Sequence, residues 1–204
     1  MSSRARSIGI FGGTFNPPHV AHVAAAEAFS RRIDPDILMI MPDFIPPHKS
    51  FAGTVTPNQR LEMCKLAFSH IKNVEISDME IARGGKSYTA NTLTELSYTG
   101  CDLYFLCGTD MFLTLDSWYS PETIFRLATI CYVRREADAA LDAEIQRCTA
   151  LYEQKYNAKI IPVDMDTVQL SSTEVRAALS SLGKTDTIPT SVMKYIEEEE
   201  GLYK

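Results

Sequence analysis

The stretch from Ser7 to Arg32 most strongly limits how this chain can fold. It begins with a short apolar run, Ser7 to Phe11, which has the length of a buried parallel strand. We expect Gly12 and Gly13 to end this strand, because glycine adopts positive φ easily and leaves room for a ligand against the backbone. Val20 to Arg32 has the spacing of an amphipathic helix. A strand, a glycine turn and a helix in this order point backbone N–H groups and a helix N-terminus at one spot.

The connection between this strand and this helix contains Asn16-Pro17-Pro18. A residue that precedes proline avoids the helical region, so we expect Asn16 and Pro17 to be extended. Pro18 can open the helix, because its missing N–H would have no partner in the first turn. The inward positions of the helix are expected to be Val20, Val23, Ala24, Phe29 and Ile33.

Strand-length apolar runs alternate with helical patterns along the rest of the chain. We expect further strands at 37–41, 74–76, 101–107, 128–133 and 159–163, with Ile81 on a continuing edge beyond the third strand. We expect helices at 56–68, 87–96, 111–115, 137–156 and 190–199, and another that opens near residue 171. This alternation predicts an α/β fold that is Rossmann-like and doubly wound, with a mostly parallel sheet and helices on both faces. We expect a single domain over residues 1–204, with a C-terminal helical part from about residue 171.

Charge and composition exclude several classes of protein. The net charge of −6 over 204 residues argues against a general nucleic-acid binder, which needs a basic face. The chain has no run of about eighteen apolar residues, as a membrane span requires, and its N-terminus lacks the apolar segment of a signal peptide. We therefore expect a cytoplasmic protein without a membrane partner. The five cysteines show no CxxC spacing, and we expect small buried hydrophobic residues rather than zinc ligands or disulfides.

Two histidines lie where the first helix is expected to begin. Backbone N–H groups at a helix N-terminus attract phosphate, and the spacing of three residues places His19 and His22 on the same side of the helix. Both can offer N–H donors to a phosphoryl group, or cations when protonated. The pattern is neither the GxGxxG fingerprint nor a P-loop, because no GK[ST] follows. The alternative interpretation is a surface turn with two incidental histidines.

Three further residues lie in loops beyond expected strands, the region where open α/β sheets bind ligands. Lys49, at the end of Pro46-Pro47-His48-Lys49, can reach a phosphate, or it is a solvated loop lysine. Asp110 can accept hydrogen bonds from ribose hydroxyls, or it caps a helix. Trp118 is the only tryptophan, and it offers a flat face to an aromatic ring or covers the core.

A second pattern that suits phosphate is Ser171-Ser-Thr-Glu-Val-Arg176. Its hydroxyl groups, the N–H groups of a helix start and a guanidinium together can hold an anion. The alternative is a simple N-cap followed by a surface arginine. The helix expected at 87–96 presents a similar opening, which by itself indicates no more than a helix start.

The stretch Gly12-Gly-Thr-Phe-Asn-Pro-Pro-His-Val-Ala-His22 resembles the (H/T)xGH motif of the nucleotidyltransferase superfamily, and within it bacterial nicotinate-nucleotide adenylyltransferase. PPHK, SYTANTL, GTD, the tryptophan and SSTEVR follow in the order of that family, so the resemblance covers essentially the whole chain. Asn16 stands where aspartate is usual, and Ala21 stands where glycine is usual. Arg134-Arg-Glu136 replaces the usual Arg-Pro-Gly, and we favour Arg134 for the family position.

The resemblance implies transfer of AMP from ATP to nicotinate mononucleotide, giving nicotinate adenine dinucleotide and pyrophosphate in NAD biosynthesis. It implies Mg²⁺ on the ATP phosphates, no metal held by the protein alone and no nucleic-acid partner, and a homo-oligomer stays open. The implied catalytic residues are His19, His22, Lys49 and Arg176. The implied ATP-binding residues are Gly12, Gly13, Thr14, Phe15, His19, His22, Gly108, Asp110, Ser172, Thr173 and Arg176. The implied substrate-binding residues are Asn16, Lys49, Thr89, Ala90, Trp118, Tyr119 and Arg134.

Three other functions stay open from the sequence. A related adenylyltransferase would act on nicotinamide mononucleotide or phosphopantetheine, but SYTANTL and Trp118 favour a substrate with an aromatic ring, which phosphopantetheine lacks. A nucleotide-binding sensor without catalysis is disfavoured by four intact residues, His19, His22, Lys49 and Arg176. An activator related to aminoacyl-tRNA synthetases is disfavoured by the acidic charge and the lack of a tRNA-binding extension.

Overall fold

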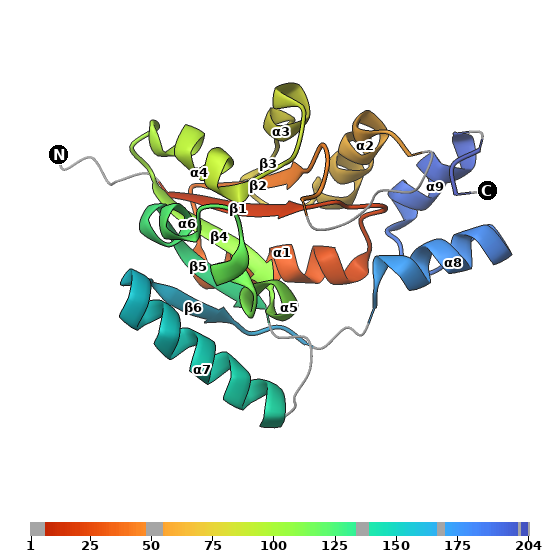
Figure 1. The fold of residues 1–204 in the computed structure, drawn as a ribbon. Helices are drawn as coiled ribbons and strands as arrows, with labels where there is room; N and C mark the ends of the chain where they lie inside the picture. The colour runs from red at the N-terminus through yellow and green to blue at the C-terminus, as the bar shows by residue number, and fades with distance from the viewer. Residues whose placement is uncertain (1–6, 48–54, 134–138, 167–169, 200, 204) are drawn as a thin grey trace.

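Parallel strands form one six-stranded sheet in the part of the chain that the structure describes (Figure 1). The structure is a computed structural model and describes residues 7–47, 55–133, 139–166, 170–199 and 201–203. The strands are β1 (Ser7–Gly13), β2 (Ile37–Pro42), β3 (Val74–Ile76), β4 (Asp102–Gly108), β5 (Ala128–Val133) and β6 (Ile160–Val163). Their order is β3-β2-β1-β4-β5-β6, and all neighbours are parallel. The predicted α/β, Rossmann-like fold is therefore confirmed, and its order reverses between β1 and β4, where such sheets bind ligands.

Helices cover both faces of this sheet, as predicted. One face is packed by α1 (Val20–Ile33) and α2 (Pro57–Phe68), which are joined by the C-terminal α8 (Ser172–Leu182) and α9 (Thr190–Glu198). The other face is packed by α4 (Thr89–Ser97), α5 (Thr109–Phe112), α6 (Pro121–Leu127) and α7 (Ala139–Tyr156). The short α3 (Met79–Arg83) contacts β2, and a 3₁₀ turn spans Leu115–Ser117.

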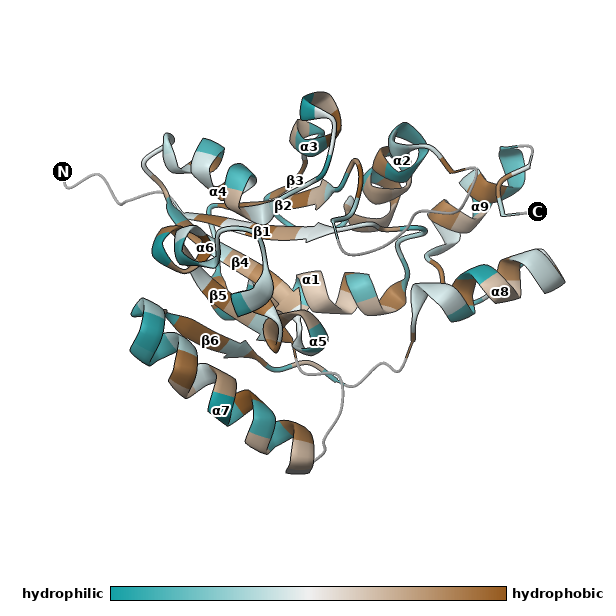
Figure 2. Cartoon of the chain, viewed as in Figure 1, coloured by the Kyte–Doolittle hydropathy of each residue, from teal (hydrophilic) through white to brown (hydrophobic). Residues whose placement is uncertain are grey.

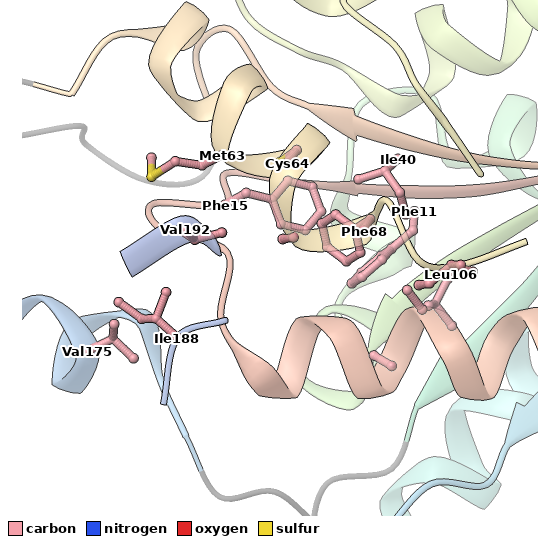
Figure 3. Close-up of a cluster of buried hydrophobic side chains, with 14 of the residues drawn as sticks. Phe11, Phe15, Ile40, Met63, Cys64, Phe68, Leu106, Val175, Ile188 and Val192 are labelled. Atoms are coloured by element: carbon pink, nitrogen blue, oxygen red, sulfur yellow. The ribbon is translucent and has the colours of Figure 1, made fainter. Parts of the chain in front are cut away.

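Alternating apolar residues in the strands explain why both faces need helices. In β1, Ile8 and Ile10 join the cluster under α4–α7, whereas Phe11 joins the cluster under α1 and α2. Figure 2 shows hydrophobic residues along β2, β5 and β6. Figure 3 shows Phe11, Phe15 and Phe68 together in the α1–α2 cluster, and the ring centroid of Phe15 lies 5.4 Å from that of Phe11 and 5.7 Å from that of Phe68.

The inner side of α1 differs from the prediction. Its buried residues are Ala21, Ala25, Ala26, Ala28 and Phe29. Of the five positions predicted to face inward, only Phe29 is fully buried, and the others are half-buried. Alanines let the helix lie close to the sheet, and this closeness is visible at Gly9, where an added Cβ would lie 3.0 Å from the Phe29 ring.

The glycine pair of β1 also differs from the prediction. The strand does not break after Phe11, because Gly12 and Gly13 belong to β1 and pair with Met41 and Pro42 of β2. The left-handed conformation falls on Phe15 instead, with φ of 47°. Gly13 is required by a close approach, since an added Cβ would lie 3.2 Å from the Phe15 ring. Both glycines were expected to leave room for a ligand against the backbone. Only Gly12 has this room, because an added Cβ there would lie 3.9 Å from its nearest neighbour.

Several element boundaries need correction. Pro18 does not open α1, because His19 is the N-cap and the helix begins at Val20. Ile81 lies in α3 rather than on a continuing strand edge. The N-cap of α4 is Tyr88, and α6 was not predicted.

The burial of the cysteines agrees with the expectation that they are small hydrophobic residues. All five cysteines are free thiols, and four of them are buried. Within the described residues, the helices are all too short or too polar to cross a membrane.

Candidate active site

A cavity of about 490 Å³ opens at the carboxyl ends of β1, β2 and β4. This volume is typical of a site for a small ligand. Fifteen of the residues predicted for the site line it: Gly12, Gly13, Thr14, Phe15, Asn16, His19, His22, Thr89, Gly108, Asp110, Trp118, Tyr119, Ser172, Thr173 and Arg176. Segments that are far apart in the sequence therefore meet at one place.

Three of the predicted site residues are not placed on this cavity. Ala90 does not line it, because its side chain is buried in the core under α4. Lys49 and Arg134 lie outside the described residues.

The two histidines form a stacked pair at the start of α1. Their ring centroids are 3.7 Å apart, and the edge of Phe15 packs against His22 at 5.1 Å. The backbone N–H of His19 donates to Nδ1 of His22 at 3.2 Å. A ring nitrogen that accepts a hydrogen bond carries no proton, so neutral His22 carries its proton on Nε2. His22 therefore has a donor to present to an anion in the cavity.

The C-terminal helix α8 meets this pair. Ser172 Oγ lies 3.3 Å from His19 Nε2, which joins the second phosphate pattern to the first. Ser171 caps α8 by accepting from the N–H of Glu174 at 3.2 Å, and its own N–H and hydroxyl donate to the Glu174 carboxylate. These hydrogen bonds lower the pKa of Glu174. The predicted N-cap is thus present, and it fixes the first turn of α8 at the cavity.

Arg176 forms hydrogen bonds with one residue from each of the two stretches predicted to bind phosphate. Its Nη1 donates to the backbone oxygen of Asn16 at 3.0 Å, and its Nη2 donates to Thr173 Oγ1 at 3.2 Å.

The side chain of Asn16 is bound by a residue near the C-terminal end of the chain, because the hydroxyl of Tyr203 donates to Asn16 Oδ1 at 2.6 Å. Burial raises the pKa of Tyr203, so the phenol stays protonated and remains a donor. The asparagine that departs from the family pattern therefore keeps an acceptor role.

A buried ion pair supports the wall of the cavity, and the sequence analysis did not predict this pair. Arg60 of α2 is 1% exposed and lies 3.1 Å from Asp43, which lines the cavity after β2. Arg60 also donates to the backbone oxygens of Thr14 at 2.8 Å and Asp43 at 2.6 Å, while the Thr14 hydroxyl donates to Asp43 at 2.8 Å. Burial lowers the pKa of Arg60, and the Asp43 carboxylate opposes this. One guanidinium thus holds together the loops that follow β1 and β2.

Replacing Arg60 should destabilise the protein strongly. We expect Arg60→Met to lower the free energy of unfolding by about 3–5 kcal/mol, because it leaves the buried Asp43 carboxylate without its cation. Equilibrium unfolding in urea measures this. The matched control is Arg31→Met, since Arg31 is 70% exposed and its ion pair with Glu27 spans 3.9 Å, so we expect a loss below about 1 kcal/mol. Equal losses in the two variants would contradict the role of Arg60.

One part of the cavity lining is aromatic. Tyr88 and Tyr119 pack with centroids 4.6 Å apart, and Trp118 packs edge-on against Phe105 at 6.3 Å. The first turn of α4 begins beside them at Thr89. The carbonyl of Tyr88 accepts from the N–H groups of Asn91 and Thr92, so the amides of Thr89 and Ala90 precede the first helical hydrogen bonds. A ligand that carries an aromatic ring and an anionic group fits this part of the cavity.

Asp110 is one of the carboxylates that line the cavity. It lies beyond β4 and inside α5, whose N-cap is Gly108, so the alternative that Asp110 is the cap is wrong. Across the ranges that the structure describes, no three His, Cys, Asp or Glu side chains are grouped to hold a metal ion.

Comparisons with known proteins show the family to which this chain belongs. A family model described as cytidylyltransferase-like matches residues 10–178. The Listeria monocytogenes protein named "Probable nicotinate-nucleotide adenylyltransferase" is 32% identical over 195 residues, which cover 95% of each chain. The Geotalea uraniireducens protein of the same name is 36% identical over 208 residues, which cover 94% of this chain and 96% of that protein. The solved structure of Plasmodium falciparum nicotinic acid mononucleotide adenylyltransferase complexed with NaAD shares the fold, with a TM-score of 0.72 and 16% identity over 97% of both chains.

Proposed function

Because the chain belongs to the cytidylyltransferase-like family and, within it, to the nicotinate-nucleotide adenylyltransferases, we infer that it transfers the adenylyl group of ATP to nicotinate mononucleotide. The products are nicotinate adenine dinucleotide and pyrophosphate, and the reaction is a step of NAD biosynthesis. The observation that carries this inference is one cavity lined by two unlike groups of residues. The paired histidines and Arg176 form one group, and Trp118 with the start of α4 forms the other.

ATP is assigned to the group of lining residues that presents hydrogen-bond donors. His19 and His22 hold its phosphates together with the backbone from Gly12 to Phe15, and Arg176 with Ser172 and Thr173 holds the β- and γ-phosphates. Gly108 and Asp110 hold the adenosine ribose, much as an acidic residue does in dinucleotide-binding folds. Two helix N-termini, those of α1 and α8, add favourable fields for the triphosphate.

Nicotinate mononucleotide is assigned to the aromatic part of the lining. Trp118 stacks on the pyridine ring, while the backbone amides of Thr89, Ala90 and Tyr119 donate to the nicotinate carboxylate. Asn16, Lys49 and Arg134 complete the proposed contacts, with Lys49 on the phosphate of the mononucleotide. The support for Lys49 and Arg134 comes from their sequence motifs alone.

The reaction needs no base and no covalent protein intermediate. An oxygen of the mononucleotide phosphate, already ionised, attacks the α-phosphorus of ATP, and the bond from that phosphorus to the β-phosphate oxygen breaks as pyrophosphate leaves. The protein's task is to bring two polyanions together and to stabilise the charge that develops on the α-phosphoryl oxygens. We assign this task to the histidine donors and Arg176.

We propose that Mg²⁺ enters the site with ATP. Asp43 is already bound by Arg60 and Thr14, which leaves phosphate oxygens and water as the main ligands. Mg²⁺ commonly binds in this way, with few protein carboxylates. The ion would neutralise charge on the leaving pyrophosphate.

The function is tested by comparing acceptors. The purified protein is supplied with ATP and, separately, with nicotinate mononucleotide, nicotinamide mononucleotide and phosphopantetheine, and pyrophosphate release is followed. We expect turnover with the nicotinate compound and little with the others. Preference for phosphopantetheine, or no pyrophosphate with any acceptor, would contradict the proposal.

Binding of ATP should require the guanidinium group of Arg176, and a different cation at this position should not replace it fully. We expect Arg176→Ala to raise the KM for ATP by roughly tenfold or more, as loss of a charge-assisted hydrogen bond predicts. Arg176→Lys should fall between this variant and the wild type, because an ammonium cannot make the forked contact. Steady-state kinetics with varied ATP measures this, and Arg147→Ala on the exposed side of α7 is the control. If the Ala and Lys variants both match the wild type, the assignment of α8 to ATP is wrong.

The organisation of the protein is proposed on the same basis. We propose one nucleotidyltransferase domain over residues 1–204, with its helical C-terminal part from about residue 171. We propose the cytoplasm as its location, because five free thiols suit a reducing compartment. A homo-oligomer is compatible with this domain.

A further inference from the structure

A buried carboxylate lies at the cavity and is not used in the reaction described above. Glu80 belongs to α3, is 8% exposed and lines the cavity. Burial raises the pKa of its carboxyl, and hydrogen bonds from Thr92 and Ser87 oppose this rise. A carboxylate beside the place proposed for a substrate carboxylate would repel it unless its charge is compensated by neighbouring groups.

The neighbours of Glu80 provide this compensation. The Thr92 hydroxyl donates to Glu80 at 2.6 Å, and the nearby Ser87 side chain also acts to lower the pKa of Glu80. Arg83 lies 3.6 Å from Glu80 and donates to Thr92 Oγ1 at 2.7 Å. Asp43 is the other charged group that acts on Glu80, and it is itself paired with Arg60. The Oε1 atom of Glu80 is therefore held by donors of the protein.

These hydrogen bonds connect three segments of the cavity wall. Ser87 accepts from the N–H of Phe44 at 2.9 Å, and its own N–H donates to the oxygen of Ile45 at 3.0 Å, so the loop after β2 is joined to the start of α4. Thr92 lies in the first turns of α4, and Glu80 lies in α3. Glu80 thus connects α3 to both sides of the turn in which Thr89 begins the helix.

We propose that Glu80 is a positioning residue for the acid group of the mononucleotide, acting through Thr92 and Ser87 to fix the first turn of α4. This inference rests on the proposed function, because that function places the nicotinate carboxylate at this turn. The network predicts an effect on one substrate only. Loosening the turn should weaken binding of nicotinate mononucleotide and leave ATP binding unchanged, since the groups assigned to ATP lie on other elements.

The test uses three variants of the full chain and two ligands. Glu80→Gln keeps the size of the side chain and removes its charge, and Thr92→Val keeps the shape of the side chain and removes the hydroxyl. Glu95→Gln is the matched control, because Glu95 lies on α4 and pairs with Arg83 at 2.7 Å but is 45% exposed and does not line the cavity. Binding of nicotinate mononucleotide is followed by the fluorescence of Trp118, the chain's single tryptophan, and binding of ATP by calorimetry.

We expect the Kd for nicotinate mononucleotide to rise about tenfold in both network variants, as loss of one buried hydrogen bond predicts, and to stay unchanged in the control. Unchanged binding in both network variants would overturn the proposal. An equal rise in the Kd for ATP, accompanied by a lower Tm, would overturn it as well, because it would indicate a general loss of structure. Failure of the proposed function is distinguishable, since the wild type would then make no dinucleotide from ATP and nicotinate mononucleotide.

Discussion

Nicotinate mononucleotide should be used with a kcat/KM up to roughly 10⁴-fold higher than that of nicotinamide mononucleotide, a ratio that sites built for specific hydrogen bonds can reach. The physical reason lies at the start of α4. The backbone amides assigned to the acid group can only donate, so they match the two acceptor oxygens of a carboxylate. An amide offers one acceptor and places its NH₂ against other donors, and each buried polar group left unpaired costs about 1–3 kcal/mol.

Initial rates with the two mononucleotides at saturating ATP measure this ratio. The two substrates differ in a single group, so each serves as the control for the rest of the other molecule. Equal kcat/KM values would contradict the assignment of the α4 start to the acid and would indicate dual specificity. Preference for the amide would contradict it more strongly.

Removing the donor of His22 should lower kcat by roughly 10²–10³-fold, the range observed when one donor to a transition-state oxygen is lost. This expectation follows from the tautomer of the His22 imidazole. His22 accepts through Nδ1 from the His19 N–H, so Nε2 carries the proton that the α-phosphoryl oxygens require. His22→Ala removes both nitrogens, and His22→Asn retains an acceptor near the Nδ1 position but has no donor at the Nε2 position.

Single-turnover rates at saturating substrates compare these variants. We expect Ala and Asn to lose similar amounts of kcat, because both lack the Nε2 donor. The control is His70→Ala, since His70 is exposed and pairs with Glu27 at 3.0 Å on a different surface, and this change should leave kcat unaltered. Near-normal kcat in His22→Ala would remove this residue from the mechanism.

The parallel sheet and the residues that line the cavity could largely be predicted, because both depend on local patterns. Apolar runs of strand length that alternate with helices specify a parallel sheet, and ligand groups in such sheets follow the carboxyl ends of strands. His19, Asp110 and Arg176 each lie in a short motif at such a place, and all three line one cavity. The motifs in the sequence were therefore enough to predict that these three residues line one site.

The remaining features depend on tertiary packing. Arg60 has the sequence context of an ordinary helix arginine, and only the three-dimensional contacts with Thr14 and Asp43 show it as a buried cation. Tyr203 contacts Asn16 across 187 residues of sequence, and no local pattern predicts such a pair. Asp43 is different, because a carboxylate directly after the second strand was a signal that could have been used.

The inner side of α1 shows how packing overrides hydrophobicity. The larger residues Val20 and Val23 were expected inside, yet the helix buries alanines and leaves these valines half-buried. Close packing against β1 favours small side chains there. Similarly, the pair Gly12 and Gly13 suggested a turn, but strand pairing with β2 continues through both.

The fate of the ATP phosphorus atoms tests the central claim, adenylyl transfer to nicotinate mononucleotide, most directly. The wild-type protein is incubated with nicotinate mononucleotide and with ATP labelled either on the α-phosphorus or on the γ-phosphorus, and the products are separated and identified by mass. We predict that the α label appears in nicotinate adenine dinucleotide and the γ label in pyrophosphate, with one pyrophosphate for each dinucleotide. Release of the γ label as single phosphate, or an α label that never reaches the dinucleotide, would contradict the claim.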